Sequence, residues 1–327
     1  MGTNDATLAV ENLRTHFFTR AGVVKAVDGV SFTVGRGEVL GLVGESGSGK
    51  SVTGFSILGL VDEPGRIVDG SSIRFQGQEL VGASESRLRQ LRGRRIAMIF
   101  QDPMMTLNPV LRIETQMVEA IQAHEKVGHR AAFERARDAL GQVGIASPEE
   151  RLKAYPHQFS GGMRQRVAIA IALLHSPDLI VADEPTTALD VTIQAQILFE
   201  VQKLCERSGT ALIWITHDLA VVSGLADKIA VMYAGRIVDS GEAAQVIEHP
   251  LHPYTRGLMD SVPSRNRRGA MLNQIPGMTP SLLDLPKGCP FRPRCSRATE
   301  QCEEMPVETT PVEGHSVRCF HPLVEGA

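Results

Sequence analysis

The sequence predicts an α/β protein with a parallel sheet, a helical insertion and an irregular C-terminal tail. A nearly continuous apolar run at 38–43 leads into a glycine-rich loop, and a helical pattern follows the loop. Two more short apolar runs, at 179–182 and 211–215, are separated by a helical stretch. Runs that are apolar throughout suit strands buried on both faces of a parallel sheet. The alternation of strand and helix therefore indicates an α/β fold.

Length and charge narrow the class of protein. The 327 residues allow two or three domains at roughly 100–200 residues each. With 34 basic and 37 acidic residues the net charge is -3, so nucleic acid is not expected as a partner. The longest apolar run, 167–174, is shorter than the roughly 20 residues that cross a bilayer. The N-terminus shows no signal-peptide pattern, so we expect a cytoplasmic protein.

The elements follow in order along the chain. Residues 8–43 suggest several short strands, and the apolar spacing after Lys50 predicts a helix that closes at Pro64. Residues 102–176 are mainly helical in pattern and form the predicted insertion. From position 241 onward prolines accumulate, which predicts an irregular tail.

The glycine-rich loop has the spacing G-x-x-x-x-G-K-S. Such a loop turns successive backbone N–H groups toward phosphate oxygens, with a lysine for the terminal phosphates and a hydroxyl for Mg²⁺. The alternative is a plain glycine-rich turn. No asparagine is followed by lysine, as guanine recognition would need, and the third glycine of a dinucleotide fingerprint is missing, so ATP is the expected ligand. The expected contacts are Gly44, Glu45, Ser46, Gly47, Ser48, Gly49, Lys50, Ser51 and Val52.

Two carboxylates end the apolar run at 179–182. Asp183 is the candidate for the Mg²⁺ side of the site, and Glu184 can polarise a water for attack on the terminal phosphate. The alternative is that both residues merely cap a strand.

A second anion-binding segment begins a helix. Ser160 can cap this helix, and Gly161 and Gly162 leave backbone N–H groups open. A domain with one phosphate loop has use for a second such segment when two subunits face each other. The alternative is an ordinary helix cap.

At this point the chain resembles the ATP-binding subunits of ABC transporters, specifically those of peptide and nickel importers. The signature segment departs from the commoner Leu-Ser-Gly-Gly-Gln at Phe159 and Met163, as other peptide-importer subunits do. The resemblance implies a P-loop, RecA-like core with an antiparallel β subdomain and a helical subdomain over about 102–176. It places this nucleotide-binding domain at 1–240 and a peptide-importer tail at 241–327.

The resemblance also implies roles for single residues. Phe17 would stack on adenine, although a phenylalanine near a strand is often core. Gln101, Glu184 and His217 would be catalytic, and His217 would contact the terminal phosphate. Asp190 would belong to the Ala-Leu-Asp segment between subunits. The Mg²⁺ contacts would be Ser51, Gln101 and Asp183.

The implied partners are a second ATP-binding subunit, two membrane permeases and an extracytoplasmic solute-binding protein, with no nucleic acid. The chain would lie peripherally on the cytoplasmic face of the membrane and energise uptake of dipeptides or oligopeptides. Nickel or another small solute is the alternative cargo, and a soluble non-transport ABC ATPase is a weaker alternative. The sequence leaves open the solute and whether the ATPase pair is a homodimer.

Four cysteines cluster in the tail, where a metal site is a stronger interpretation than disulfides or four free thiols. Their spacing alone leaves zinc and an iron–sulfur cluster open. The resemblance to dipeptide-importer tails implies a [4Fe-4S] cluster, with neighbouring arginines 292, 294, 297 and 318 offsetting thiolate charge. Cys205 is expected in the core. The expected ligands are Cys289, Cys295, Cys302 and Cys319.

Overall fold

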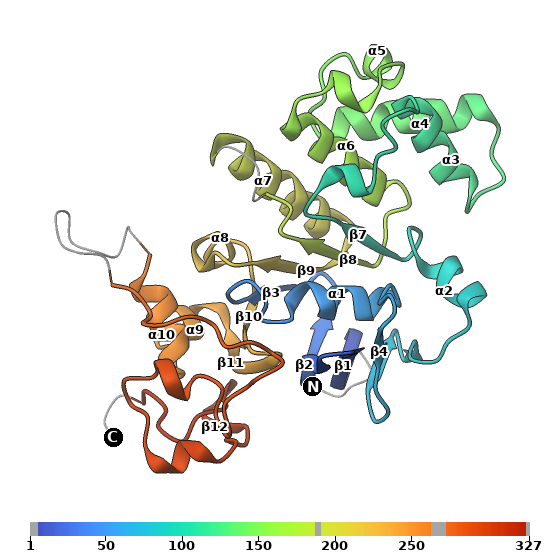
Figure 1. Cartoon of the computed structure of the whole chain (residues 1–327). Coiled ribbons are helices and arrows are strands. Elements are labelled where there is room, and N and C mark those ends of the chain that lie inside the picture. The colour runs from blue at the N-terminus through green and yellow to red at the C-terminus, as the bar shows by residue number, and fades with distance from the viewer. Residues whose placement is uncertain (1–5, 187–190, 263–272, 325–327) are drawn as a thin grey trace. The chain divides into compact units, whose positions relative to one another are not determined.

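The computed structural model describes residues 6–186, 191–262 and 273–324 (Figure 1). The chain forms two compact units. The first unit consists of Met1–Val34, Val39–Val81 and Trp214–Ala327, and the second of Gly35–Glu38 and Gly82–Ile213.

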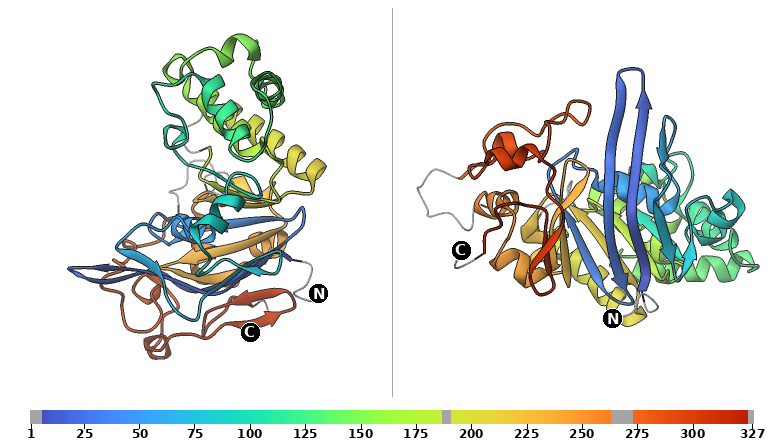
Figure 2. Two further views of the ribbon diagram at one scale, coloured as in Figure 1. Left: turned by 90° about the vertical axis from the view of Figure 1, so that its right-hand side faces the viewer. Right: turned by 90° about the horizontal axis from the view of Figure 1, so that it is seen from below.

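An antiparallel sheet opens the first unit, with strand order β2-β1-β5-β6 and β4 paired to β1. β1 and β2 have fourteen residues each and lie side by side as a long ribbon (Figure 2). The expectation of several short strands is therefore wrong here. Glycine within β2 is tolerated, because Gly29 takes a φ of 84° that suits this residue. The strands are β1 (Ala6–Thr19), β2 (Gly22–Gly35), β4 (Gly65–Ile67), β5 (Ser72–Phe75) and β6 (Gln78–Glu79).

The remaining strands of the first unit centre on a buried parallel pair. β3 (Val39–Val43) is buried throughout and pairs in parallel with β10 (Lys228–Tyr233). β11 (Arg236–Glu242), β13 (His315–Val317) and β12 (Thr309–Val312) continue this sheet with antiparallel pairings. The helices of this unit are α1 (Lys50–Leu58), α8 (Leu219–Ser223), α9 (Ala243–Glu248), α10 (Pro253–Asp260), η4 (Arg292–Arg294) and η5 (Glu300–Glu303).

The tail is more regular than its prolines suggest. The prediction of an irregular tail is wrong for α9 and α10, and for the β12–β13 hairpin that pairs with β11. Pro253 is the first residue of α10, where a missing N–H and a fixed φ do not interrupt the helix. Prolines at such positions mark a helix start rather than disorder.

The second unit carries the helical insertion, in which α3, α5 and α6 all pack against α4 (Figure 1). α4 buries Ala132, Ala136 and Leu140, a spacing of four that places one apolar face against the insertion's core. The prediction of mainly helical structure over 102–176 is confirmed. The helices are α2 (Glu85–Leu91), η1 (Pro103–Met105), α3 (Ile113–Gln122), α4 (His129–Gln142), α5 (Pro148–Leu152), η2 (Pro156–Gln158), α6 (Gly161–Leu173) and α7 (Val191–Ser208).

Two parallel strands of this unit, β7 and β8, lead directly to predicted site residues. β7 (Ile96–Ile99) and β8 (Leu179–Asp183) pair with Ile99 opposite Ala182. β9 (Ala211–Thr216) then carries the chain from the second unit into the first. Cys205 is buried in α7 as expected of a core residue, and burial raises the pKa of its thiol to about 12.

Candidate nucleotide site and cysteine pocket

The loop between β3 and α1 is closed by its own lysine. The side chain of Lys50 is buried, and its Nζ donates to the carbonyl oxygens of Gly44 at 2.7 Å and Glu45 at 3.0 Å. The N–H of Ser48 donates to the same Glu45 oxygen at 3.2 Å. Ser46 and Gly47 lie exposed on the outer side of the loop. The predicted phosphate contacts thus form one turn with the lysine at its centre.

Glycine is required at the end of this loop. Gly49 has a φ of 102°, and a Cβ there would lie 2.2 Å from the carbonyl oxygen of Ala26. Gly49 is the N-cap of α1 and makes no side-chain cap hydrogen bond there, so the loop brings backbone and not a capping side chain to the positive end of the helix. Ser51 and Val52 are the second and third residues of α1. This geometry suits a phosphate anion.

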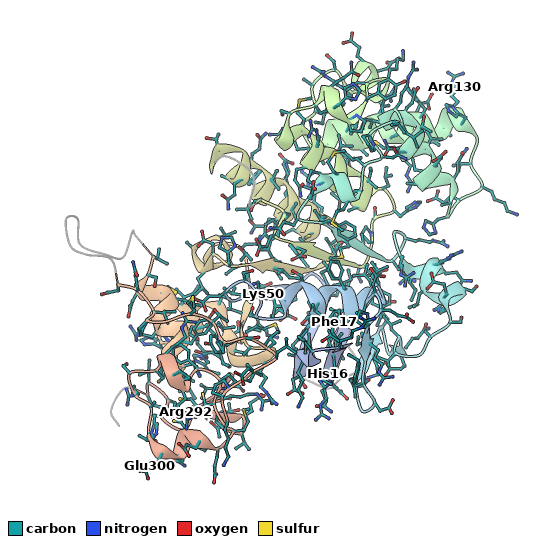
Figure 3. All side chains as sticks on the ribbon, in the orientation of Figure 1. His16, Phe17, Lys50, Arg130, Arg292 and Glu300 are labelled. Carbon is teal, nitrogen blue, oxygen red and sulfur yellow. The ribbon has the colours of Figure 1, made fainter. Side chains whose placement is uncertain are left out.

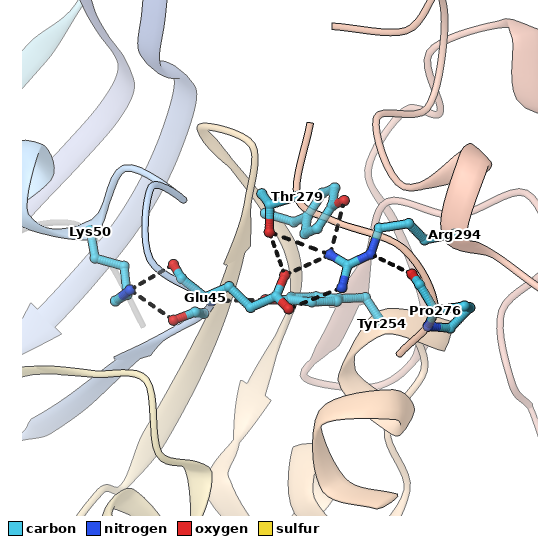
Figure 4. A network of polar contacts seen from close by, with 8 residues as sticks. Glu45, Lys50, Tyr254, Pro276, Thr279 and Arg294 are labelled. Atoms are coloured by element: carbon cyan, nitrogen blue, oxygen red, sulfur yellow. Dashed lines mark hydrogen bonds and ion pairs between the residues drawn. The ribbon is translucent and has the colours of Figure 1, made fainter. Parts of the chain in front are cut away.

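Glu45 is held by residues of the C-terminal tail (Figure 4). Its main-chain N–H donates to Tyr254 Oη at 2.9 Å. Its carboxylate accepts two bonds from Arg294, at 2.7 and 3.0 Å, and one from Thr279 at 2.9 Å. Arg294 Nε also donates to the carbonyl of Pro276 at 2.9 Å. Burial raises the pKa of Glu45, but the hydrogen bonds of Arg294 and Thr279 outweigh it and lower the pKa below its usual range.

Aromatic rings pack around this ion pair. Tyr233 and Tyr254 lie 4.6 Å apart between ring centroids, and Phe291 is 5.3 and 5.4 Å from them. The Arg294 guanidinium carbon lies 5.8 Å from the Tyr233 ring centre and 5.9 Å from that of Phe291. Its side chain is only 5% exposed. The rings therefore fix the guanidinium in place for Glu45.

The second unit brings Gln101 and Glu184 together at the ends of two neighbouring strands. Asp183 is the last residue of β8 and is buried, and Glu184 follows it. Gln101 follows β7, and its Nε2 donates to Glu184 Oε2 at 3.3 Å. Glu184 has a φ of 43°, a strained value for a residue with a side chain, and such strain clusters at functional sites. These three predicted residues share one edge of the parallel pair.

The signature segment caps α6. Ser160 is the N-cap, and its Oγ accepts the N–H of Met163 at 3.3 Å. Ser160 and Gly161 are exposed, and Gly162 is half-buried. Further along the helix, buried Gln165 donates to the carbonyl oxygen of Phe100 at 3.4 Å. Because Phe100 precedes Gln101, α6 is tied to the segment that carries this glutamine.

The remaining predicted site residues are Phe17, His217 and Asp190. Phe17 is half-buried on β1 opposite Gly65, where a Cβ would lie 2.6 Å from its ring (Figure 3). Its neighbour Phe18 is 39% exposed, with the Arg66 guanidinium 4.1 Å from its ring centre. His217 follows β9 and is exposed. Asp190 lies outside the described residues.

The four tail cysteines line one pocket. The N–H of Arg297 donates to Cys295 Sγ at 3.4 Å, and that of His321 donates to Cys319 Sγ at 3.3 Å. Burial raises the pKa of Cys319 to about 11 and also raises the pKa of Cys295. Over residues 6–186, 191–262 and 273–324, no three His, Cys, Asp or Glu side chains converge as they stand on a point that could hold a metal. The pocket is lined by the cysteines at 289, 295, 302 and 319 together with His252, Phe291, Arg292, Arg297 and His321, among others.

The tail arginines have different surroundings. Arg292 and Arg297 line the cysteine pocket, and Arg292 Nη1 also pairs with Glu303 at 2.7 Å. Arg294, in contrast, is directed to Glu45, and Arg318 pairs with Glu308 at 2.8 Å. The sequence signal for Arg294 and Tyr254 at the phosphate loop was missing, because their partner lies more than 200 residues away.

His252 sits between the pocket and a buried carboxylate. Its Nδ1 accepts the N–H of Tyr254 at 3.0 Å, so Nε2 carries the proton. Nε2 is buried and has no hydrogen-bond partner among the described residues, and His252 is one of the residues that line the cysteine pocket. Burial lowers the pKa of His252 to about 4. Asp239, which is also buried, accepts the N–H groups of Leu251 and His252 and a 2.7 Å bond from His315 Nε2.

None of the helices in the described part of the chain is both long and apolar enough to cross a bilayer.

Comparison with known proteins identifies the family. Residues 27–187 match the family described as "ABC transporter", and residues 238–302 match "Oligopeptide/dipeptide transporter, C-terminal region". The oligopeptide transport ATP-binding protein OppD of Escherichia coli (strain K12) is 48% identical, covering 98% of this chain and 95% of that protein. The dipeptide transport ATP-binding protein DppD of the same strain is 46% identical, covering 97% of each.

Solved structures agree on the fold. CbiO1 from Clostridium perfringens, part of the ABC transporter complex cbiONQ, is 27% identical with a TM-score of 0.63, covering 75% of this chain and 92% of that one. The dimeric ATP-binding cassette MJ0796 bound to ADP and Pi has a TM-score of 0.66 at 24% identity, covering 72% of this chain and 98% of that one. The predicted fold class is thereby confirmed for the nucleotide-binding core. The chain belongs to the ATP-binding subunits of ABC transporters, within the group of oligopeptide and dipeptide transport ATP-binding proteins.

Proposed function

We propose that this chain hydrolyses ATP to drive the uptake of dipeptides or oligopeptides. It works with a second ATP-binding subunit, two membrane permeases and an extracytoplasmic solute-binding protein, and lies peripherally on the cytoplasmic face of the membrane. The names of the relatives at 46–48% identity support peptide as the cargo. Residues 1–240 serve as the nucleotide-binding domain, with a helical subdomain over 102–176, and 241–327 as the tail.

The observation that carries the catalytic role is the pair formed by Gln101 and Glu184. The 3.3 Å bond orients one oxygen of the Glu184 carboxylate at the end of β8, beside Asp183. A carboxylate fixed in this way can accept a proton from a water that attacks the terminal phosphate. Asp183, Gln101 and Ser51 supply oxygen ligands suited to Mg²⁺.

The other residues bind and position ATP. Lys50 exchanges its carbonyl partners for the terminal phosphates, and the phosphate oxygens lie at the positive end of α1, where Gly49 places no capping side chain. His217 contacts the terminal phosphate, and Phe17 stacks on adenine. The segment of Ser160, Gly161 and Gly162, exposed at its first two residues, contacts ATP held by the partner subunit, and Asp190 acts at the same subunit boundary.

Glu184→Gln tests the catalytic assignment. In the complex assembled with its permeases, we expect this variant to bind ATP as the wild type does while turnover falls by about 100-fold or more, because the amide cannot accept a proton. Glu149→Gln, which changes an exposed carboxylate of α5, serves as the matched control with unchanged turnover. Wild-type turnover in Glu184→Gln would remove the residue from the mechanism.

Uptake of labelled dipeptide by the assembled complex, compared with uptake of nickel, tests which solute is transported.

We propose further that Cys289, Cys295, Cys302 and Cys319 hold a [4Fe-4S] cluster, which when bound stores or transfers one electron. The four thiols line one pocket, and backbone N–H groups point at Cys295 and Cys319. His252, whose Nε2–H has no hydrogen-bond partner among the described residues, lines the same pocket, and a sulfur acceptor within reach would satisfy this donor. Four soft donors also suit zinc, which the experiment distinguishes.

Anaerobic purification tests this site. We expect iron and sulfide with absorbance at about 400 nm, lost in Cys302→Ser and kept in Cys205→Ser, which alters a buried thiol of α7. A colourless protein that contains zinc would show that the site holds a structural zinc ion and not the cluster. A protein without metal would refute both assignments.

A further inference from the structure

The phosphate loop is held from outside by the C-terminal tail. Glu45, the second residue of the loop, uses its main-chain N–H on Tyr254 and its carboxylate on Arg294 and Thr279. These partners lie 209, 249 and 234 residues further along the chain. Within the first unit, the tail and the loop therefore share one polar network.

The contact between Arg294 and Glu45 is a strong one. Two parallel N–H···O bonds join guanidinium and carboxylate, and the Arg294 side chain is 5% exposed while that of Glu45 is 30% exposed. Bidentate pairs fix geometry as well as contributing energy. Removing Glu45 leaves the buried Arg294 guanidinium without its carboxylate, which is costly, and removing Arg294 takes two hydrogen bonds from the half-buried Glu45 carboxylate.

The arrangement anchors the loop while leaving its lysine able to move. Lys50 currently bonds to the carbonyls of Gly44 and Glu45, so it must release them to reach phosphate. The tail grips Glu45 through the opposite groups, its N–H and its carboxylate. The backbone therefore keeps its curvature when Lys50 leaves.

We propose that Tyr254 and Arg294 are positioning residues for ATP, because they fix the phosphate loop at Glu45 and make the tail part of the nucleotide site. This inference rests on the proposed function. Both residues also adjoin the cysteine pocket: Arg294 precedes Cys295, and Tyr254 is two residues after His252. Arg294 and Tyr254, which anchor the loop, are therefore only one or two residues along the chain from residues that line the cysteine pocket.

The central experiment is a double-mutant cycle on the full-length chain. ATP affinity is measured by titration calorimetry for Arg294→Gln, Glu45→Gln and the double variant. We expect each single change to raise the Kd for ATP about tenfold, within the range of coupling between sites, and the double variant to be no worse than either single. Arg294→Lys should recover part of the affinity. Glu308→Gln, which removes the partner of Arg318 in the same tail, is the matched control with unchanged Kd.

Two further measurements separate positioning from general damage. In the assembled complex, KM for ATP should rise more than kcat falls, whereas a merely unfolded fraction lowers kcat alone. Because coupling is reciprocal, ATP should slow hydrogen exchange at 276–279 and 292–295 in the wild type and not in Glu45→Gln.

The outcomes separate this proposal from the proposed function. If the wild type binds ATP, Lys50→Gln does not, and the three variants at Glu45 and Arg294 keep the wild-type Kd, the positioning role is wrong and the ATPase assignment stands. Additive losses in the double variant would also overturn it. If Lys50→Gln binds ATP as tightly as the wild type, the nucleotide site itself is misassigned.

Discussion

The two helices that begin with anion-binding segments, α1 and α6, are built in opposite ways. α1 begins with Gly49, which offers no side-chain cap in the described structure, and the loop before it is closed by buried Lys50 and gripped by the tail. α6 begins with Ser160, whose hydroxyl caps the helix, and both Ser160 and Gly161 face solvent.

The difference indicates that the loop before α1 is completed within its own chain, whereas the segment at α6 is available to a second subunit. The loop before α1 is finished by residues of its own chain, from Gly44 to Arg294. At the start of α6, Ser160 and Gly161 are exposed, as expected of a surface offered to a second subunit.

The largest expected effects test whether each segment acts in the isolated chain or only in the assembled complex. Lys50→Gln should weaken ATP binding of the isolated chain by about 100-fold, because the buried cation that we propose for phosphate binding is lost. Ser160→Arg should leave that binding unchanged but lower turnover of the assembled complex by about 100-fold, since a large side chain covers the N–H donors. Ser160→Thr keeps the cap and serves as the control. Equal loss of binding in both main variants would show that the two segments are not distinct.

Two glycine substitutions sharpen the comparison through stability. Gly49→Ala should lower the free energy of unfolding by about 2–4 kcal/mol, because its φ of 102° and the Ala26 carbonyl 2.2 Å from the new Cβ both oppose a side chain. Gly161→Ala, in α6 with no heavy atom within 4 Å of the new Cβ, should raise it by about 0.5 kcal/mol. Urea unfolding measures both changes. A destabilised Gly161→Ala would mean that α6 is as tightly constrained as the phosphate loop.

The smallest effect concerns pH. The pKa of Glu45 lies below its ordinary value of 4.5 in the folded chain, so on acidification the unfolded chain takes up the proton first. The stabilisation is complete above the ordinary pKa and is lost as pH falls through the lowered one. The difference in unfolding free energy between wild type and Glu45→Gln should therefore be constant from about pH 7 to 5 and shrink below 4.5. A constant difference down to acid unfolding would contradict the ion pair.

Local patterns explain what the sequence could predict. The phosphate loop, the cap at Ser160 and the carboxylates after β8 depend on neighbours a few residues away, so spacing alone located them. Four cysteines in one tail predicted a metal site; the four thiols line one pocket, and the metal itself stays a prediction.

Long-range contacts explain what it could not. Arg294 was expected to offset the charge of the thiolates, yet it donates a hydrogen bond to Glu45, 249 residues earlier in the chain. Prolines suggested irregular structure where Pro253 in fact starts α10. The His252 proton became visible only when the Tyr254 N–H was seen to occupy the other ring nitrogen.

The separation of Glu45 and Arg294 also has a consequence for the order of synthesis. The two residues are 249 positions apart, so at about 5–20 residues per second the ribosome adds the arginine roughly 12–50 s after the glutamate. During that interval the nascent chain carries a complete phosphate-binding motif without the residues that hold it. A chain interrupted before its tail is therefore expected to compete poorly for cellular ATP.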